Sequence, residues 1–126
     1  MITRDLGFFR EFPHGDPEGP SLLECAEKGD AQIQCLIADY LEAGAMLAST
    51  AQRVFDVLSE ENDDVGLLAI RTDGAWMWPA DLPYYVRKYN ISLPGDFIIH
   101  AKSLGWVAPD LSRADLLSIE EEMFPG

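Results

Sequence analysis

Val65-Gly-Leu-Leu-Ala-Ile-Arg-Thr-Asp-Gly-Ala-Trp-Met-Trp-Pro79 is the stretch around which the rest of this chain is organised. Two β-prone runs flank Asp73-Gly74, and an Asp-Gly pair in that position is the strongest short-range signal of a β-hairpin. Both residues tolerate the positive φ that a tight turn requires. With this pair as the loop, Thr72 would lie opposite Ala75. Pro79 should end the second strand because it has no N–H to donate.

Both faces of the predicted hairpin are largely apolar, which favours strands covered on two sides. Residues 45–50 indicate a short third strand, which matters because an isolated hairpin is only marginally stable in water. We therefore expect an α+β fold, with a small antiparallel sheet centred on the 65–78 hairpin and packed by about five helices. One face of the hairpin carries Leu68, Ile70 and Met77, and the other carries Leu67, Ala69, Arg71, Trp76 and Trp78.

Helix signals lie on both sides of the hairpin. Ser21 and Glu24 form a capping box, and residues 30–43 carry apolar side chains at helical spacing. A short helix is predicted over residues 51–58. Asn90 is suited to end the helix that follows the hairpin, because it tolerates a left-handed conformation. The predicted helices begin near Ser21, Asp30, Ala51, Asp81, Pro94 and Ser112.

Length and composition predict one globular domain over residues 1–126, in which residues 1–20 form a loop-like N-terminal arm. The hydrophobic fraction of 48% is too high for a disordered chain. The apolar runs are too short to span a bilayer. The N-terminal residues do not resemble a secretion signal, so we expect a cytoplasmic protein.

The chain is strongly acidic, with nine Lys and Arg against 22 Asp and Glu and a formal net charge of -13. This charge argues against nucleic acid and against an anionic membrane surface, since both attract cations. It is consistent with solubility alone, and also with steering toward a protein partner that has a basic surface.

The search for catalytic chemistry is largely negative, and the sequence leans away from an enzyme. Cys and His are too few and too scattered for a zinc site, so no metal and no cofactor is expected. Cys25 and Cys35 are expected to be buried thiols in helices. His14 is expected in an exposed loop and His100 on a helix surface. The sequence therefore offers no catalytic residue.

Two features remain as candidate partner-binding sites. The first is an acidic loop before the hairpin, which contains Glu60, Glu61, Asp63 and Asp64. The second is the end of the hairpin, where Arg71 faces Trp76 and Trp78 follows, because aromatic residues and Arg are enriched at interface anchors. The alternative for the loop is a solvated connection. The alternative for the two indoles is packing beneath the neighbouring helices, with Arg71 stacked over one ring.

The segment Thr72-Asp-Gly-Ala-Trp-Met-Trp-Pro-Ala-Asp-Leu-Pro-Tyr-Tyr-Val86, with Tyr89 and the run Leu93–Phe97, resembles a pattern in small uncharacterised bacterial proteins. In size and acidity the chain is also similar to immunity proteins of bacterial toxin systems. That likeness implies a cytosolic inhibitor that binds a cognate toxin, and it transfers no functional residues.

We therefore expect a non-catalytic, acidic protein-binding module of the toxin-neutralising type. One alternative is a small-molecule-binding or enzymatic domain with a cleft beside the hairpin. Another is a structural subunit of a larger assembly. The sequence does not specify an oligomeric state.

Overall fold

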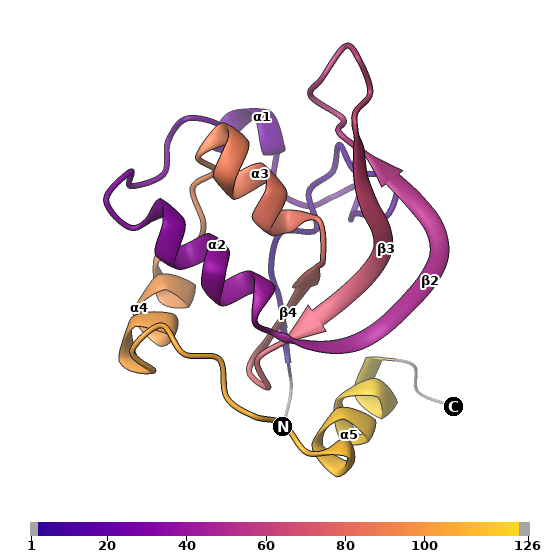
Figure 1. The fold of residues 1–126 in the computed structure, drawn as a ribbon, viewed down its shortest axis with the longest axis vertical. Helices are drawn as coiled ribbons and strands as arrows, with labels where there is room; N and C mark the ends of the chain where they lie inside the picture. Colours follow the sequence, from indigo (N-terminus) through magenta and orange to yellow (C-terminus); the bar gives the residue numbers. More distant parts are fainter. Residues whose placement is uncertain (1–2, 124–126) are drawn as a thin grey trace.

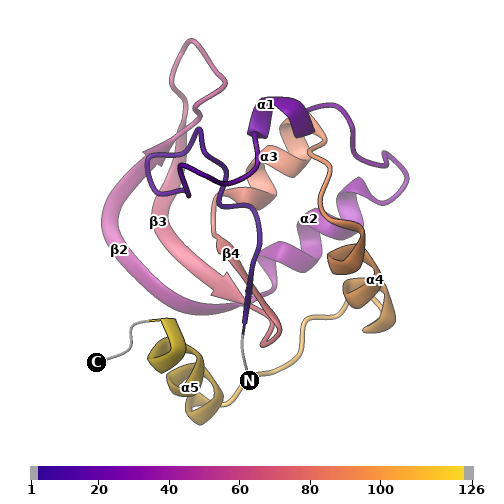
Figure 2. The same ribbon diagram turned by 180° about the vertical axis from the view of Figure 1, so that it is seen from behind.

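The computed structural model describes residues 3–123, which form five helices and four strands (Figures 1 and 2). The strands are β1 (Arg4–Asp5), β2 (Ala45–Phe55), β3 (Asp64–Thr72) and β4 (Trp76–Pro79). The helices are α1 (Leu22–Cys25), α2 (Gln34–Glu42), α3 (Leu82–Tyr89), α4 (Gly95–Ser103) and α5 (Arg113–Met123). The predicted α+β class is confirmed.

The strands form one sheet in the order β1-β4-β3-β2. β2 with β3 and β3 with β4 are antiparallel, as predicted. β1 adds a parallel strand, with Arg4 opposite Trp76, so the sheet is mixed rather than wholly antiparallel. The parallel strand comes from the N-terminal arm. The two longest strands, β2 and β3, form a curved ribbon whose concave side faces the helices (Figure 1).

The hairpin turn differs from the predicted one by its position in the chain. Thr72 lies opposite Met77, so the loop is Gly74-Ala75 and not Asp73-Gly74. The Asp73 carboxylate accepts the main-chain N–H groups two and three residues further on, at 2.9 and 2.7 Å. These bonds hold Asp73 at the end of the strand. The pairing moves by two residues, and the side chains keep their predicted faces because strands alternate with a period of two.

β2 continues through residues 51–55, where the sequence predicts a helix. Val54 pairs with Gly66, and Phe55 pairs with Asp64. The weak helical pattern is overridden because β3 offers main-chain hydrogen bonds along its length. Three register shifts interrupt the pairing of β2 with β3. Shifts of this kind bend a strand, which is consistent with the curvature of the ribbon.

The core lies between β4 and helices α2, α3 and α4. Trp78, Tyr85 and Phe97 are fully buried, and the Phe97 ring centroid lies 6.0 Å from that of Trp78. α3 ends at Asn90, which has the predicted left-handed conformation with φ 47°. The inward faces of α2 and α3 carry most of the expected residues, because the following are buried: Ile37, Tyr40, Leu41, Leu82, Tyr85 and Val86. Leu36, which the helical spacing also places on the inward face, is 43% exposed.

Residues 3–20 form an arm that is irregular apart from β1, and it lies in front of the sheet in Figure 2. Phe9 and Phe12 anchor the arm, since both side chains are buried. The Glu11 carboxylate accepts the N–H groups of Leu22 and Leu23 at 2.8 and 3.0 Å. The arm therefore caps α1 in addition to Ser21, whose hydroxyl accepts from the third helical N–H.

Candidate partner-binding surface

The acidic loop connects β2 to β3 and projects from the fold (Figure 1). Glu60 and Glu61 are exposed, and within residues 3–123 neither forms an ion pair. Asp63 and Asp64 are held by cations: Lys88 Nζ lies 3.3 Å from Asp63, and Arg53 Nη2 lies 2.7 Å from Asp64. The hydrogen bonds from Arg53 lower the pKa of Asp64. Two of the four predicted carboxylates are therefore unpaired and available to a partner.

The two indoles at the hairpin end are buried, so their predicted role as surface anchors is corrected. Trp76 is 4% exposed and Trp78 is 0% exposed. Trp78 Nε1 donates to the carbonyl of Leu41 at 3.1 Å, and the Arg4 guanidinium stacks 4.1 Å from the Trp76 ring centroid. The physical reason is that α2 and α4 cover this part of the sheet. Burial of both rings against helices agrees with the alternative that the sequence left open.

Arg71 does not stack on either indole. Its Nη1 donates to the Gly44 carbonyl at 2.8 Å, and within the described residues it has no carboxylate partner. Arg71 lies opposite Trp78 in the pairing of β3 with β4 and lines a groove along the ribbon. It therefore remains a candidate contact residue.

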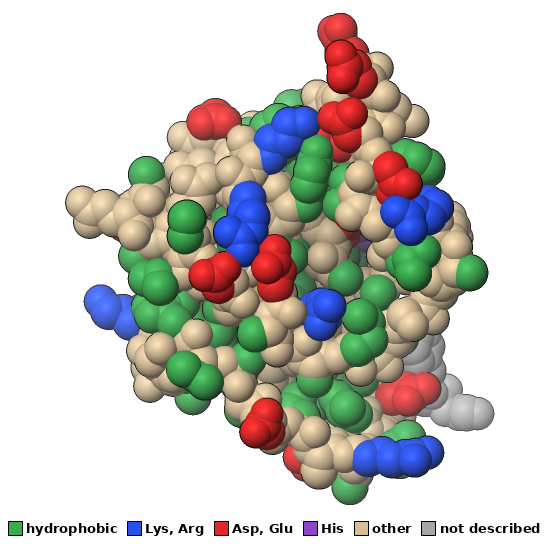
Figure 3. Space-filling model, viewed as in Figure 1, with side chains coloured by type: hydrophobic (Ala, Val, Ile, Leu, Met, Phe, Trp, Pro, Cys, Tyr) green, Lys and Arg blue, Asp and Glu red, His purple; other side chains and the backbone are tan. Residues whose placement is uncertain are grey.

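That groove was not predicted, and it has a volume of about 450 Å³. Met46 of β2 and Leu67 of β3 line it with exposed fractions of 43% and 46%, beside Arg53 and Arg71. Asp81, just before α3, lines it as well. Figure 3 shows hydrophobic and basic side chains together over the ribbon, below the acidic loop. The sequence did not indicate this groove, because residues 51–58 were predicted to form a helix and not the end of a long β2 strand.

The outer edge of β2 is unpaired, because within residues 3–123 β2 has β3 as its only strand partner. An open edge can accept a further strand. Here the register shifts break the edge into short pieces, with a gap between Ser49 and Arg53. This irregularity disfavours a long added strand. The side chains of the groove are thus a better docking surface than the strand edge.

Within residues 3–123, three aspartates are buried: Asp56, Asp73 and Asp81. Asp73 Oδ2 accepts from Tyr40 at 2.5 Å and lies 3.0 Å from His100 Nε2. Because its other oxygen binds the turn, Asp73 is fully engaged in joining α2, the hairpin and α4. Its role is structural.

His14 is half-buried rather than in an exposed loop, and its Nε2 lies 3.2 Å from Asp81 Oδ2. Among the residues described, neither histidine hydrogen-bonds to a cysteine. Cys25 is half-buried, whereas Cys35 is exposed, so the prediction of two buried thiols is wrong for Cys35. The side chains do not assemble a Cys–His nucleophile.

Two further findings concern residues 3–123. They contain no group of three His, Cys, Asp or Glu side chains placed to hold a metal ion. None of their helices has the length and apolar character needed to cross a membrane.

The chain matches no protein-family model, no curated protein sequence and no solved structure.

Proposed function

We propose that this protein is a non-catalytic binding module for a protein partner with a basic surface, of the toxin-neutralising immunity type, in the bacterial cytoplasm. One observation carries the proposal: exposed Met46 and Leu67 lie in a groove beside a loop with two unpaired carboxylates. The net charge of -13 supports a basic partner. The proposed contact residues are Met46, Leu67, Arg71, Glu60 and Glu61.

These residues have different tasks. Glu60 and Glu61 steer the partner during encounter, because exposed charges mainly raise association rates. Met46 and Leu67 provide the apolar contact, and full burial of such a side chain contributes about 1.5–3 kcal/mol. Arg71 has hydrogen-bonding capacity left beyond its bond to Gly44 and can bind a carboxylate or carbonyl of the partner.

The test uses the whole protein as bait in an extract of the cell that produces it, followed by kinetics with the captured protein. Met46→Ser with Leu67→Ser should abolish capture by removing the apolar contact. Ile99→Ser, at a residue of α4 that is 71% exposed and outside the groove, is the matched control and should capture normally. Glu60→Gln with Glu61→Gln should slow association at low salt, and the difference should shrink at high salt.

Capture that persists in the Met46/Leu67 variant would refute the docking surface. Unchanged association rates in the Glu60/Glu61 variant at low salt would refute the electrostatic part. Restored growth of cells that express a captured toxin, on co-expression of this protein, would establish neutralisation.

A second candidate function is a small-molecule-binding or enzymatic domain. The groove favours this function, because it lies beside the hairpin and is lined by Arg53, Arg71 and Asp81 together with apolar side chains. A small molecule that co-purifies with the wild type and is lost in Arg71→Ala would support this function over the first. The third alternative, a subunit of a larger assembly, is tested by the mass of the protein in solution.

A further inference from the structure

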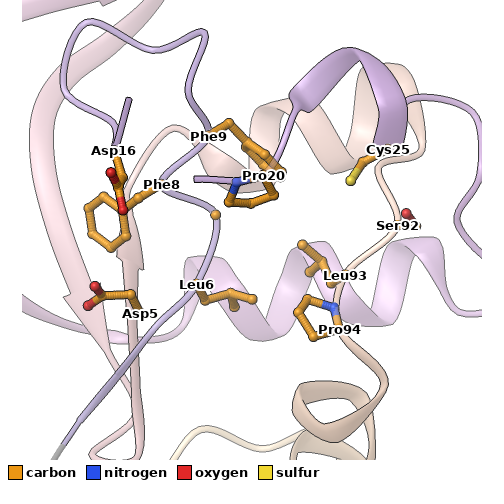
Figure 4. A pocket seen from close by; sticks show the side chains of 11 residues that line it. Asp5, Leu6, Phe8, Phe9, Asp16, Pro20, Cys25, Ser92, Leu93 and Pro94 are labelled. Carbon is orange, nitrogen blue, oxygen red and sulfur yellow. The ribbon is translucent and has the colours of Figure 1, made fainter. Parts of the chain in front are cut away.

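A separate pocket of about 330 Å³ lies beneath the N-terminal arm, between α1 and the segment that joins α3 to α4 (Figure 4). Its size is within the range of small-molecule sites. Apolar side chains dominate the walls: Leu6 and Phe9 come from the arm, and Leu93 and Pro94 come from the segment before α4. The groove on the β2–β3 ribbon shares none of these lining residues.

Two carboxylates flank the pocket. In Figure 4 the Phe8 ring lies between Asp5 and Asp16. Within residues 3–123 neither carboxylate has a cationic partner, and the neighbouring Arg4 binds Asp96 at 2.6 Å. Asp16 accepts only a main-chain N–H, that of Glu18, at 2.9 Å. Partial desolvation and then the charge of Asp16 raise the pKa of Asp5, although both carboxylates remain accessible to solvent.

The same three residues also line a second hollow of about 340 Å³, on the side of the arm that faces Ile70 and Met77. Phe8 therefore stands where two hollows adjoin, with both carboxylates beside it. The face of an aromatic ring attracts cations, and two carboxylates next to it add to that attraction. The charge and the apolar walls together are complementary to a cation with a hydrocarbon body.

The arm is held in place before any ligand arrives. The N–H of Leu6 donates to Met77 of β4 at 2.8 Å, and the N–H of Asp16 donates to Phe8 at 3.1 Å. At Gly15 a Cβ atom would lie 1.9 Å from the carbonyl oxygen of Phe9, so the loop closes tightly there. Prior ordering of this kind lowers the entropic cost of binding.

We propose that this pocket binds a small organic amine, whose ammonium group lies at the Phe8 ring between Asp5 and Asp16 and whose hydrocarbon body enters the space lined by Leu6, Phe9 and Leu93. The site is independent of the proposed partner-binding surface. Its ligand is a free amine and not the lysine of a protein.

The test is an NMR titration of the whole protein with 2-phenylethylamine, 2-phenylethanol and phenylacetate. These probes share an apolar body and differ in charge. The amine should cause saturable shifts at Phe8, Phe9, Cys25 and Leu93, the alcohol should bind more weakly, and phenylacetate should bind least. Added salt should weaken only the amine.

Asp5→Asn with Asp16→Asn should weaken the amine about tenfold and leave the alcohol unchanged, since each exposed ion pair accounts for at most about a fivefold change. Glu18→Gln with Glu24→Gln, which changes two nearby acids outside the pocket, is the control and should bind as the wild type does. The Met46/Leu67 variant should also bind normally, which separates failure here from failure of the proposed function.

Equal affinity for the amine and the alcohol would overturn the proposal, and so would an unchanged amine affinity in the Asp5/Asp16 variant. Tighter binding of an N-acetylated lysine amide than of 2-phenylethylamine would overturn the choice of a free amine. The NMR spectrum of each variant reports directly whether it is folded.

Discussion

Asp56 is expected to be the most important single charged side chain for stability. It is 0% exposed and lies just after β2. Its carboxylate accepts the hydroxyls of Tyr84 and Tyr89, both at 2.7 Å, and the ammonium of Lys88 at 3.2 Å. Its other oxygen accepts the N–H of Leu58 at 2.8 Å. These bonds attach the end of the β2–β3 ribbon to α3, so Asp56→Ala should detach it.

The magnitude follows from the number and kind of these bonds. A hydrogen bond to a charged group contributes about 1.5–3 kcal/mol. The contributions are not additive, and removal of one partner from a buried ionic cluster costs about 3–5 kcal/mol. Asp56→Ala should therefore lower the free energy of unfolding by about 3–5 kcal/mol. For a chain of this size the melting temperature should fall by about 10–20 °C.

The same cluster predicts a pH dependence. Burial raises the pKa of Asp56, but the hydrogen bonds from Tyr89, Tyr84, Leu58 and Lys88 outweigh burial and hold it below the ordinary value of 3.8. The unfolded chain therefore takes up the proton at a higher pH than the folded chain. The contribution of Asp56 is present above the unfolded pKa and is lost as the pH falls through the folded pKa. The stability difference between wild type and Asp56→Asn should shrink over that acidic range.

Urea denaturation followed by tryptophan fluorescence measures both effects. Asp63→Ala is the matched control, because Asp63 contacts the same Lys88 but is 44% exposed. An exposed ion pair contributes less than about 1 kcal/mol. A loss for Asp56→Ala no larger than that of Asp63→Ala would refute the reasoning, as would a stability difference that grows toward acidic pH.

Four further predictions concern packing, ionisation, hydrogen bonding and reactivity. Gly15→Ala should lower the free energy of unfolding, measured by urea denaturation, by at least about 2 kcal/mol because the added Cβ meets main-chain atoms. Gly95→Ala is the control and should leave that free energy unchanged, because no atom lies within 4 Å of its Cβ position. Equal effects of the two substitutions would contradict this packing. All four tyrosines have raised pKa values, with burial as the largest cause, so ultraviolet absorbance should show tyrosinate forming at a higher pH in the folded protein than in the unfolded chain. Stability should therefore fall as the pH rises above about 10, because the unfolded chain ionises first. In Tyr40→Phe the lost bond to Asp73 should lower the unfolding free energy by about 1–3 kcal/mol, and an unchanged value would show that this bond is not stabilising. A thiol reagent should modify Cys35 before the other, half-buried cysteine, and the reverse order would contradict the burial.

Interactions between near neighbours in the sequence were predicted well. The Ser21 cap and the left-handed stop at Asn90 are present, and the helix expected to begin near Ser112 starts there with reciprocal hydrogen bonds between Ser112 and Asp115. Each depends on groups only a few residues apart, so the chain contains the whole interaction locally. The α+β class followed from the same local patterns.

The errors fall where partners distant in the chain compete with a local pattern. Residues 51–55 have weak helical spacing, but β3 provides a full set of main-chain hydrogen bonds and draws them into β2. The Asp73-Gly74 pair indicated the correct hairpin, but the Asp73 carboxylate binds Tyr40 from α2, so it lies buried at the strand end.

The acidic loop and the hairpin end, the two candidate sites found in the sequence, show the same difference between local patterns and distant contacts. The amino-acid order placed four carboxylates within residues 60–64, and it predicted that the hairpin is central to the fold. It could not foretell that Lys88 and Arg53 would pair with two of those acids, that α2 and α4 would cover Trp76 and Trp78, or that the arm would form a pocket with Leu93. Those outcomes depend on contacts between residues far apart in the chain. Such contacts contribute free energy only in the folded state, so local sequence patterns do not reveal them.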